Sequence, residues 1–296
     1  MNELEYKFTN DTLFKMLFVK YPELLKRLVA ELLSIRLESI GQFEIVNPEM
    51  PPEAVGDKFC RLDINMTVDG QRFDLEIQVD DEGDYPERSL YYWAREYSTA
   101  LGEGRKYKEL PRTVIISIVG FNMFDCEAFH SEFQPLEVTR HTPLTDKQSL
   151  HYFELPKIPE EVSADDELKL WLALFKAKTE EELKRIEELE VPIMEQAIKA
   201  YRQVTATNEF KEIERLRSLA RHNEAAALHH AAEVEREKWQ GVVADKDAAL
   251  ADKDATIEAA IAEKDAAIAE KDAAIAEKDA AIAKIAELMA RLGAEK

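Results

Sequence analysis

The sequence predicts an α/β fold in which helices flank a mixed β-sheet, followed by an all-helical segment and a C-terminal repeat helix. Two helical stretches open the chain, strand-like stretches follow them, and one helix lies between the third and fourth strands. This α-α-β-β-β-α-β order is typical of a sheet with helices packed against it. Every Trp, Tyr and Phe lies before residue 240, so a hydrophobic core can form only in that part of the chain.

Local signals place the individual elements. The first helix is expected to begin at Asn10 or Asp11, because both side chains can cap a helix, and Tyr21-Pro22 separates it from a second helix. A third helix is predicted over about 85–101, with Pro86 in the first turn, where proline is favoured. The predicted strands are 42–46, 59–68, 71–79, 113–119, roughly 129–138 and 150–155.

Composition limits the classes of function. The 39 Lys and Arg against 60 Asp and Glu give a net charge of −21, so the chain cannot hold nucleic acid by net charge alone. Any phosphate-binding surface must be a local patch. The two cysteines, Cys60 and Cys126, lack metal-site spacing, which excludes a zinc finger and a disulfide scaffold and favours a reducing compartment. The longest apolar run, 114–119, is far short of the ~20 residues that span a bilayer, so we expect a cytoplasmic protein without a membrane partner.

The chain is predicted to have three parts, 1–160, 161–240 and 241–296. The middle part reads as a helical connector, in which Thr179 and Glu182 form a capping-box pattern. In the last part, EKDAAIA occurs three times without change over 263–283, after two related heptads. Seven residues is the coiled-coil period, although each repeat has one large apolar residue instead of two. The tail is therefore either an extended solvated helix or a weak homo-oligomerisation element.

Residues 59–79 predict a β-hairpin with one polar face. Asp69-Gly70 lies between two alternating runs, and such a pair favours a two-residue turn with positive φ at both positions. That turn fixes the register, so Asp63 would face Glu76. The opposite face carries the apolar side chains of both runs.

The polar face of this hairpin is the candidate site. Two directly opposed carboxylates, with Cβ atoms about 5 Å apart, destabilise a sheet unless something relieves the repulsion. A hard divalent cation is one relief, and Mg²⁺ coordinates a few carboxylate oxygens while keeping waters that can be activated. Gln78 lies two residues after Glu76 on the same face, within reach of such a water or a phosphate oxygen. Alternatively, this face simply meets solvent, with a shared proton or splayed carboxylates.

Five ordered sequence blocks resemble the Rpn family of recombination-promoting nucleases, also described as putative transposases, over roughly residues 5–158. The blocks are NDTLFKMLF, LDINMTVDGQRFDLEIQV, YPERSLYYWAREYSTAL, GRKYKELPRTVIISIVGFNMF and HYFELPK. The Asp on one strand and Glu-x-Gln on the next resemble the PD-(D/E)XK nuclease motif. This resemblance implies a restriction-endonuclease-like fold, cleavage of DNA with a divalent cation, most commonly Mg²⁺ with Mn²⁺ or Ca²⁺ as alternatives, and a link to recombination and mobile elements. It implies that Asp63 and Glu76 are metal ligands and Gln78 the third catalytic residue.

The sequence departs from the usual nuclease motif at Gln78, where a Lys is more common. Charge stabilisation would then come from another cation, and Lys15 or Arg88 are candidates. Arg105 and Lys106, in the most basic short patch, are candidate phosphate contacts or parts of an ordinary loop. The leading hypothesis is a metal-dependent DNA endonuclease. The alternative is a decayed nuclease domain that acts as a DNA-binding or partner-binding assembly protein.

Overall fold

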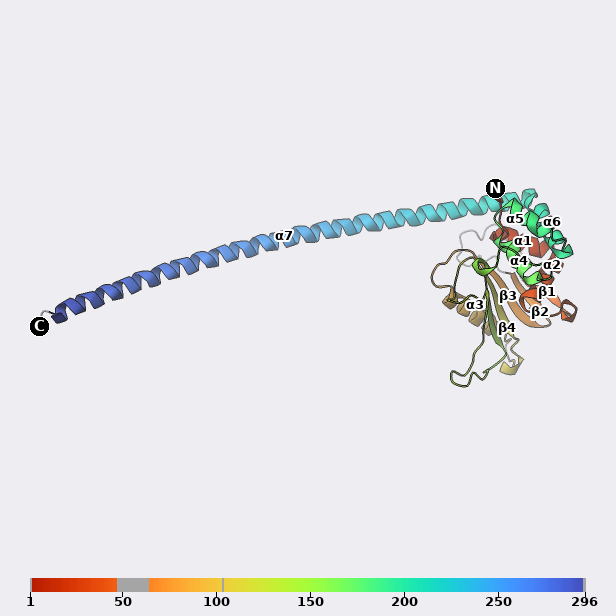
Figure 1. Ribbon diagram of the computed structural model, residues 1–296, viewed down its shortest axis with the longest axis horizontal. Coiled ribbons are helices and arrows are strands. Elements are labelled where there is room, and N and C mark those ends of the chain that lie inside the picture. The colour runs from red at the N-terminus through yellow and green to blue at the C-terminus, as the bar shows by residue number, and fades with distance from the viewer. Residues whose placement is uncertain (1, 47–63, 103, 295–296) are drawn as a thin grey trace. The chain divides into compact units, whose positions relative to one another are not determined.

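The computed structural model describes residues 2–46, 64–102 and 104–294, and its strands form one mixed sheet (Figure 1). The first three strands pair antiparallel, the third, fourth and sixth pair parallel, and the fifth runs antiparallel beside the sixth. This arrangement confirms the predicted fold class. The strand order is β1 (Phe43–Ile45), β2 (Ile64–Val68), β3 (Gln71–Gln78), β4 (Thr113–Val119), β6 (Gln148–Glu154), β5 (His130–Phe133).

Strand β4 lies at the centre of the parallel part of the sheet. All seven of its residues are buried, which explains why its sequence is almost continuously apolar instead of alternating. Val114 and Ile116 face one hydrophobic core, and Ile115 and Val119 face a second, smaller one. Helices therefore cover both faces of the sheet.

The larger core lies between the sheet and five helices, and Figure 1 shows these helices on the side of the sheet away from α3. Phe18, Trp171 and Phe175, from α1 and α4, are almost completely buried and pack against one another there. The five helices are α1 (Asp11–Lys20), α2 (Pro22–Leu32), α4 (Glu167–Lys176), α5 (Glu180–Glu187) and α6 (Pro192–Thr205). In the part of the chain that the structure describes, short 3₁₀ helices at Leu37–Ser39, Tyr107–Glu109 and Leu155–Lys157 connect other elements.

The N-terminal caps of α1 and α5 are formed by residues that the local sequence predicts. Asn10 caps α1 by accepting a hydrogen bond from the Leu13 backbone N–H at 2.9 Å. Thr179 and Glu182 form the reciprocal capping box at the start of α5, as their spacing predicts. These caps satisfy backbone N–H groups that have no partner within the helix.

The helices after residue 160 share the core of the N-terminal helices. Arg27 of α2 makes a bidentate ion pair with Glu167 of α4, with N–O distances of 2.6 and 2.7 Å. The Tyr201 hydroxyl of α6 donates to the Tyr6 carbonyl at 2.8 Å. The compact units are Met1–His222 and Asn223–Lys296, while the division at residues 160 and 240 stays a prediction.

A single helix, α7 (Asn208–Ala294), runs through the repeats (Figure 1). Phe210 near its start is fully buried in the larger core. From residue 223 onward the described side chains are almost all exposed, including the large apolar ones. Within the described ranges, no helix combines the length and apolar character needed to cross a membrane.

Candidate functional site

The β2–β3 hairpin adopts the register that its sequence predicts. Asp69 and Gly70 both have positive φ, 50° and 75°, so the turn has the conformation that the Asp-Gly pair favours. Val68 lies opposite Gln71, and Asn65 lies opposite Asp74. Asp63, predicted to face Glu76, lies outside the described residues.

Helix α3 (Tyr85–Thr99) covers the face of β3 that carries Asp74 and Glu76. Only 5% of Asp74 and 4% of Glu76 is exposed, so the interpretation of this face as a solvated surface is wrong for these two residues. Tyr85, Ser89 and Tyr92 are the buried residues of α3, at the i, i+4, i+7 spacing of one helix face. Both carboxyl groups therefore lie in a largely dry layer between sheet and helix.

Glu76 is held by a tyrosine of this helix. The Tyr85 hydroxyl, itself 1% exposed, donates to Glu76 Oε2 at 2.8 Å. The chain enters α3 at Asp84 with Pro86 in the first turn, and Tyr85, the first residue of the helix, reaches Glu76 of β3. A hydrogen bond to a carboxylate fixes its orientation and is stronger than one between neutral groups.

Polar residues lie beside Glu76 in register across the sheet to β6. Ser117 is the neighbour of Glu76 on β4, and Tyr152 is the neighbour of Ser117 on β6. The Ser89 hydroxyl donates to the Pro86 carbonyl at 2.9 Å and lies 2.6 Å from the Tyr152 hydroxyl. Burial raises the pKa of Tyr152, the Ser89 hydrogen bond opposes this, and the charge of Glu76 raises it further. Tyr152 therefore remains a neutral hydroxyl at neutral pH.

A cavity of about 250 Å³ opens beside Asp74. Asn65 and Asp74, which are opposite each other in the hairpin, line this cavity. Arg72 and Glu96 also line it, and 3.6 Å separates Arg72 Nη1 from Glu96 Oε2. The Arg72 guanidinium also donates to the Glu96 carbonyl at 3.0 Å. This cavity therefore brings Asp74 and Asn65 of the hairpin's polar face to its wall.

Gln78 is the last residue of β3. It is partly buried, and its side-chain Nε2 donates to the Asp80 carbonyl at 2.7 Å. The amide therefore braces the loop after β3 in this conformation. Its side-chain oxygen is the group left to accept a hydrogen bond from a water or a hydroxyl.

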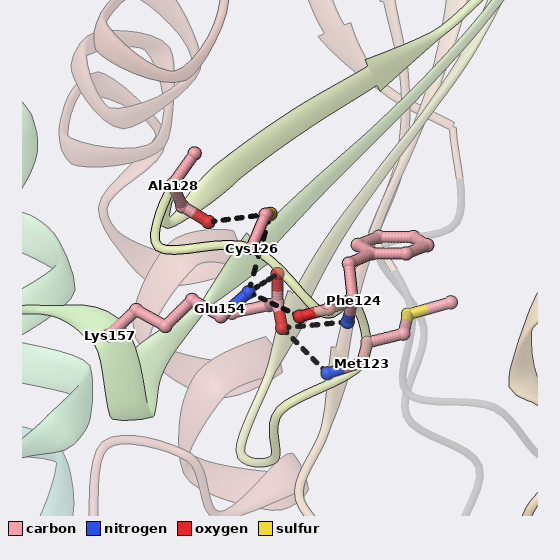
Figure 2. Close-up of polar contacts among 6 residues, drawn as sticks. All are labelled: Met123, Phe124, Cys126, Ala128, Glu154 and Lys157. Carbon is pink, nitrogen blue, oxygen red and sulfur yellow. Dashed lines mark hydrogen bonds and ion pairs between the residues drawn. The ribbon is translucent and has the colours of Figure 1, made fainter.

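Gln78, Val119 and Glu154 are neighbours in register at the ends of the parallel strands. Figure 2 shows the fully buried Glu154 accepting from the Met123 and Phe124 backbone N–H groups, at 2.6 and 3.2 Å, and from Lys157 Nζ at 2.7 Å. A buried carboxylate paired in this way fixes the loop that follows β4. Glu154 therefore orders the loop at the carboxyl ends of the parallel strands, where Gln78 also lies.

The four basic candidates lie in three different places. Lys15 is buried in α1, which packs on the opposite face of the sheet from α3. Arg88 of α3 forms an ion pair with Glu82, and its guanidinium lies 5.0 Å from the centre of the Tyr85 ring. Arg105 is exposed and pairs with Glu109 at 3.4 Å, and Lys106 beside it is exposed. Of the four, Arg88 is the one with a described contact to a residue that touches Glu76.

The donors on the polar face suit a hard cation. Glu76, Asp74 and Asn65 present oxygen ligands, the type that Mg²⁺ prefers. Among the described residues there is no group of three or more His, Cys, Asp or Glu placed to hold a metal ion. The chemistry of the donors fits a divalent cation, and the role of Asp63 as a ligand stays a prediction.

Sequence reasoning missed the residues that surround Glu76 from other elements. Tyr85, Ser89 and Tyr152 are each buried and hydrogen-bonded in this layer. The spacing of Tyr85, Ser89 and Tyr92 was a usable signal, because these residues share one helix face. The contribution of Tyr152 depends on which strand pairs with β4, and no local pattern gives that pairing.

A family model described as PD-(D/E)XK nuclease family transposase matches residues 8–231. The match spans the sheet, the helices on both of its faces and the first part of α7. It continues well past residue 158, where the sequence blocks end. Neither the comparison with curated proteins nor that with solved structures finds a match.

Proposed function

Because this chain belongs to the PD-(D/E)XK nuclease family transposases, we propose that it is a divalent-metal-dependent DNA endonuclease acting in recombination or in the movement of mobile elements. The family membership confirms the resemblance found in the sequence blocks. The observation that supports the proposal best is the position of Glu76. It is a buried carboxylate in the predicted hairpin register, held by Tyr85, with Gln78 two residues further on the same face.

In this proposal Asp63 and Glu76 hold the cation, most simply Mg²⁺. When bound, the cation lowers the pKa of a coordinated water and offsets negative charge on the phosphate. Tyr85 keeps one oxygen of Glu76 in a fixed position, and the buried layer under α3 strengthens the electrostatic interactions of the site. The Gln78 side-chain oxygen accepts a hydrogen bond from the attacking water and thereby orients it.

Positive charge near the phosphate has to come from residues other than Gln78. Arg88 is the best-placed described candidate, since its guanidinium packs against the ring of Tyr85. Arg105 and Lys106, which are exposed after α3, suit a contact with the DNA backbone. A net charge of −21 makes such local contacts necessary.

The test is cleavage of supercoiled plasmid DNA by the full chain in Mg²⁺, Mn²⁺, Ca²⁺ or EDTA. We expect nicked or linear DNA with Mg²⁺ or Mn²⁺ and none with EDTA. The Glu76→Ala chain serves as the control for a contaminating nuclease. Cleavage that persists in EDTA, or equal cleavage by Glu76→Ala, would contradict the proposal.

A second candidate function is a decayed nuclease domain that binds DNA or a partner without cutting. The observation that favours it is the neutral Gln78, whose amide is occupied by the Asp80 carbonyl. The variant Gln78→Lys restores the commoner nuclease residue. If the site is catalytic, Gln78→Lys should keep or raise cleavage and Gln78→Ala should lower it. If both variants behave as wild type, Gln78 has no role in the chemistry.

A further inference from the structure

The described part of α7 after residue 223 carries one continuous apolar stripe whose side chains are exposed. Its members recur every seven residues, apart from one four-residue step between Ile257 and Ile261. Each of their side chains is about half exposed. The stripe consists of Val243, Leu250, Ile257, Ile261, Ile268, Ile275 and Ile282.

The two sides of this stripe carry opposite charges. At about 100° per residue, positions three after and four before a stripe residue lie on one side of it, and positions four after and three before lie on the other. All residues of the first kind between Leu250 and Ile257, and from Ile261 to Ile282, are lysines, and all of the second kind are aspartates. The lysines are Lys253, Lys264, Lys271 and Lys278, and the aspartates are Asp254, Asp265, Asp272 and Asp279.

The apolar spacing by itself permits two ways of pairing two such helices. In a parallel pair in register, each stripe residue meets its own copy. In an antiparallel pair centred on Ala259, Ile257 meets Ile261, Leu250 meets Ile268 and Val243 meets Ile275, because the spacing is symmetric about that residue. The four-residue step therefore does not distinguish the two orientations.

The flanking charges do distinguish them. When two identical helices pack through the same stripe in parallel, the left flank of one meets the right flank of the other, as in parallel coiled coils. Lys271 then lies beside Asp272 of the second copy, and the same holds in each repeat. In the antiparallel pair identical flanks meet, so that Lys246 lies beside Lys271 and Asp247 beside Asp272, which is unfavourable.

We infer that α7 is a pairing surface for a second copy of this chain, and that the two helices associate parallel and in register. The isoleucine stripe forms the contact and the lysine and aspartate flanks select the orientation. With one large apolar residue per heptad, the pair is weak and depends on protein concentration. Residues 1–222 of both copies then continue from the same end of the pair, so that two Glu76 sites serve one assembly if the nuclease proposal holds.

The first experiment measures association of the full chain by sedimentation at tens of micromolar. The triple variant D265K/D272K/D279K places lysines on both flanks, and the triple variant K264D/K271D/K278D places aspartates on both. Each alone should lose association by at least about tenfold, and a mixture of the two should recover it. The matched control is E263K/E270K/E277K, which makes the same charge change on the outer side and should associate at least as well as wild type.

The second experiment reads the orientation by disulfide cross-linking in full chains with Cys60 and Cys126 replaced by Ser. Ile275→Cys should cross-link to itself, because equal positions meet in a parallel pair. Ala273→Cys, on the opposite side of the helix, should not cross-link. A mixture of Val243→Cys and Ile275→Cys should give no product that joins the two variants.

Three outcomes would overturn the inference. One is a wild-type chain that stays monomeric at all concentrations, and another is a dominant product that joins Val243→Cys to Ile275→Cys. The third is equal loss of association in the glutamate control, which would show that net charge and not the flanks controls assembly. None of these readouts uses DNA cleavage, so failure here is distinct from failure of the proposed nuclease function.

Discussion

In residues 1–222 the large apolar side chains of the core are almost completely buried, whereas the described ones of the helix over 223–289 are about half exposed or more. Phe18 and Trp171 have no exposed surface, while 47% of Ile268 and of Ile275 is exposed. In the first unit each side chain has its own surroundings, so a single substitution has a large effect. In the second, each heptad repeats the same surroundings, so the effect depends on the sum over repeats.

Core truncation should give the largest difference between the two regions. Phe175→Ala removes a ring packed against Phe14 and Phe18, and should lower the free energy of unfolding by about 3–5 kcal/mol. Ile275→Ala should change it by less than about 0.5 kcal/mol at dilute concentration, where the helix is unpaired. Urea denaturation of the full chain, followed through the unfolding of residues 1–222 (the globular unit), measures both. A loss above 2 kcal/mol for Ile275→Ala would show that the helix is part of the globular unit's stability.

Acid should also act on the globular unit. Its His151 side chain lies 2.8 Å from the Ser149 hydroxyl and 3.1 Å from His130 Nε2. Ser149 in turn donates to Glu132 at 3.0 Å, so its oxygen is available to accept from His151 Nε2–H. Burial, together with the positive charges of a protonated His130 and of Arg112, lowers the pKa of His151 to about 4, although the charge of Glu132 opposes this.

This lowered pKa sets the direction of the acid effect. The unfolded chain binds the proton at about pH 6.5 and the folded chain only near pH 4, so stability is complete above pH 6.5 and decreases as pH falls towards 4. The loss attributable to His151 is about 3 kcal/mol. Urea denaturation from pH 7 to pH 4.5 should show a smaller slope for His151→Gln than for wild type. The exposed His229 of α7 provides the control, and an equal change in slope for His229→Gln would contradict this assignment.

The hairpin was predictable because its signals are local. Asp69-Gly70 fixes the turn, and alternation then fixes the register through Asn65 and Asp74. The caps of α1 and α5 were predictable for the same reason. The burial of Asp74 and Glu76 was not, because alternation shows that two faces differ in polarity but not that a helix lies over the polar one.

The helices after residue 160 show the same limit. An amphipathic pattern in α4 or α6 predicts one buried face, but it does not say that Phe18 of α1 is the partner of Trp171. The buried Glu154 likewise gives no local signal, since its partners come from the loop after β4 and from Lys157. Tertiary pairing decides these environments, and it is set by residues far apart in the sequence.

Changing the number of repeats should have the smallest effect. Deletion of one EKDAAIA unit preserves the helical phase to within about 20°, so the remaining repeats keep their stripe and flanks aligned. The melting temperature of the globular unit should not change, and specific cleavage at dilute concentration should stay the same. Thermal melting and plasmid cleavage of the deleted and wild-type chains measure this. A large shift in melting temperature would show that the repeats contact the globular unit.

The central claim is that Asp63 and Glu76 are catalytic carboxylates and not structural ones. The most direct measurement combines melting in EDTA with plasmid cleavage in Mg²⁺ or Mn²⁺, on the same samples of wild type, Asp63→Ala and Glu76→Ala. We predict that both variants lose cleavage by about 100-fold or more. The melting temperature of Asp63→Ala in EDTA should be unchanged or higher, because one of two repelling carboxylates has been removed. Glu76→Ala also leaves the buried Tyr85 hydroxyl without its acceptor, so some loss of stability is expected there and its cleavage is the deciding readout. Variants that melt several degrees lower in EDTA and still cut DNA would contradict the account.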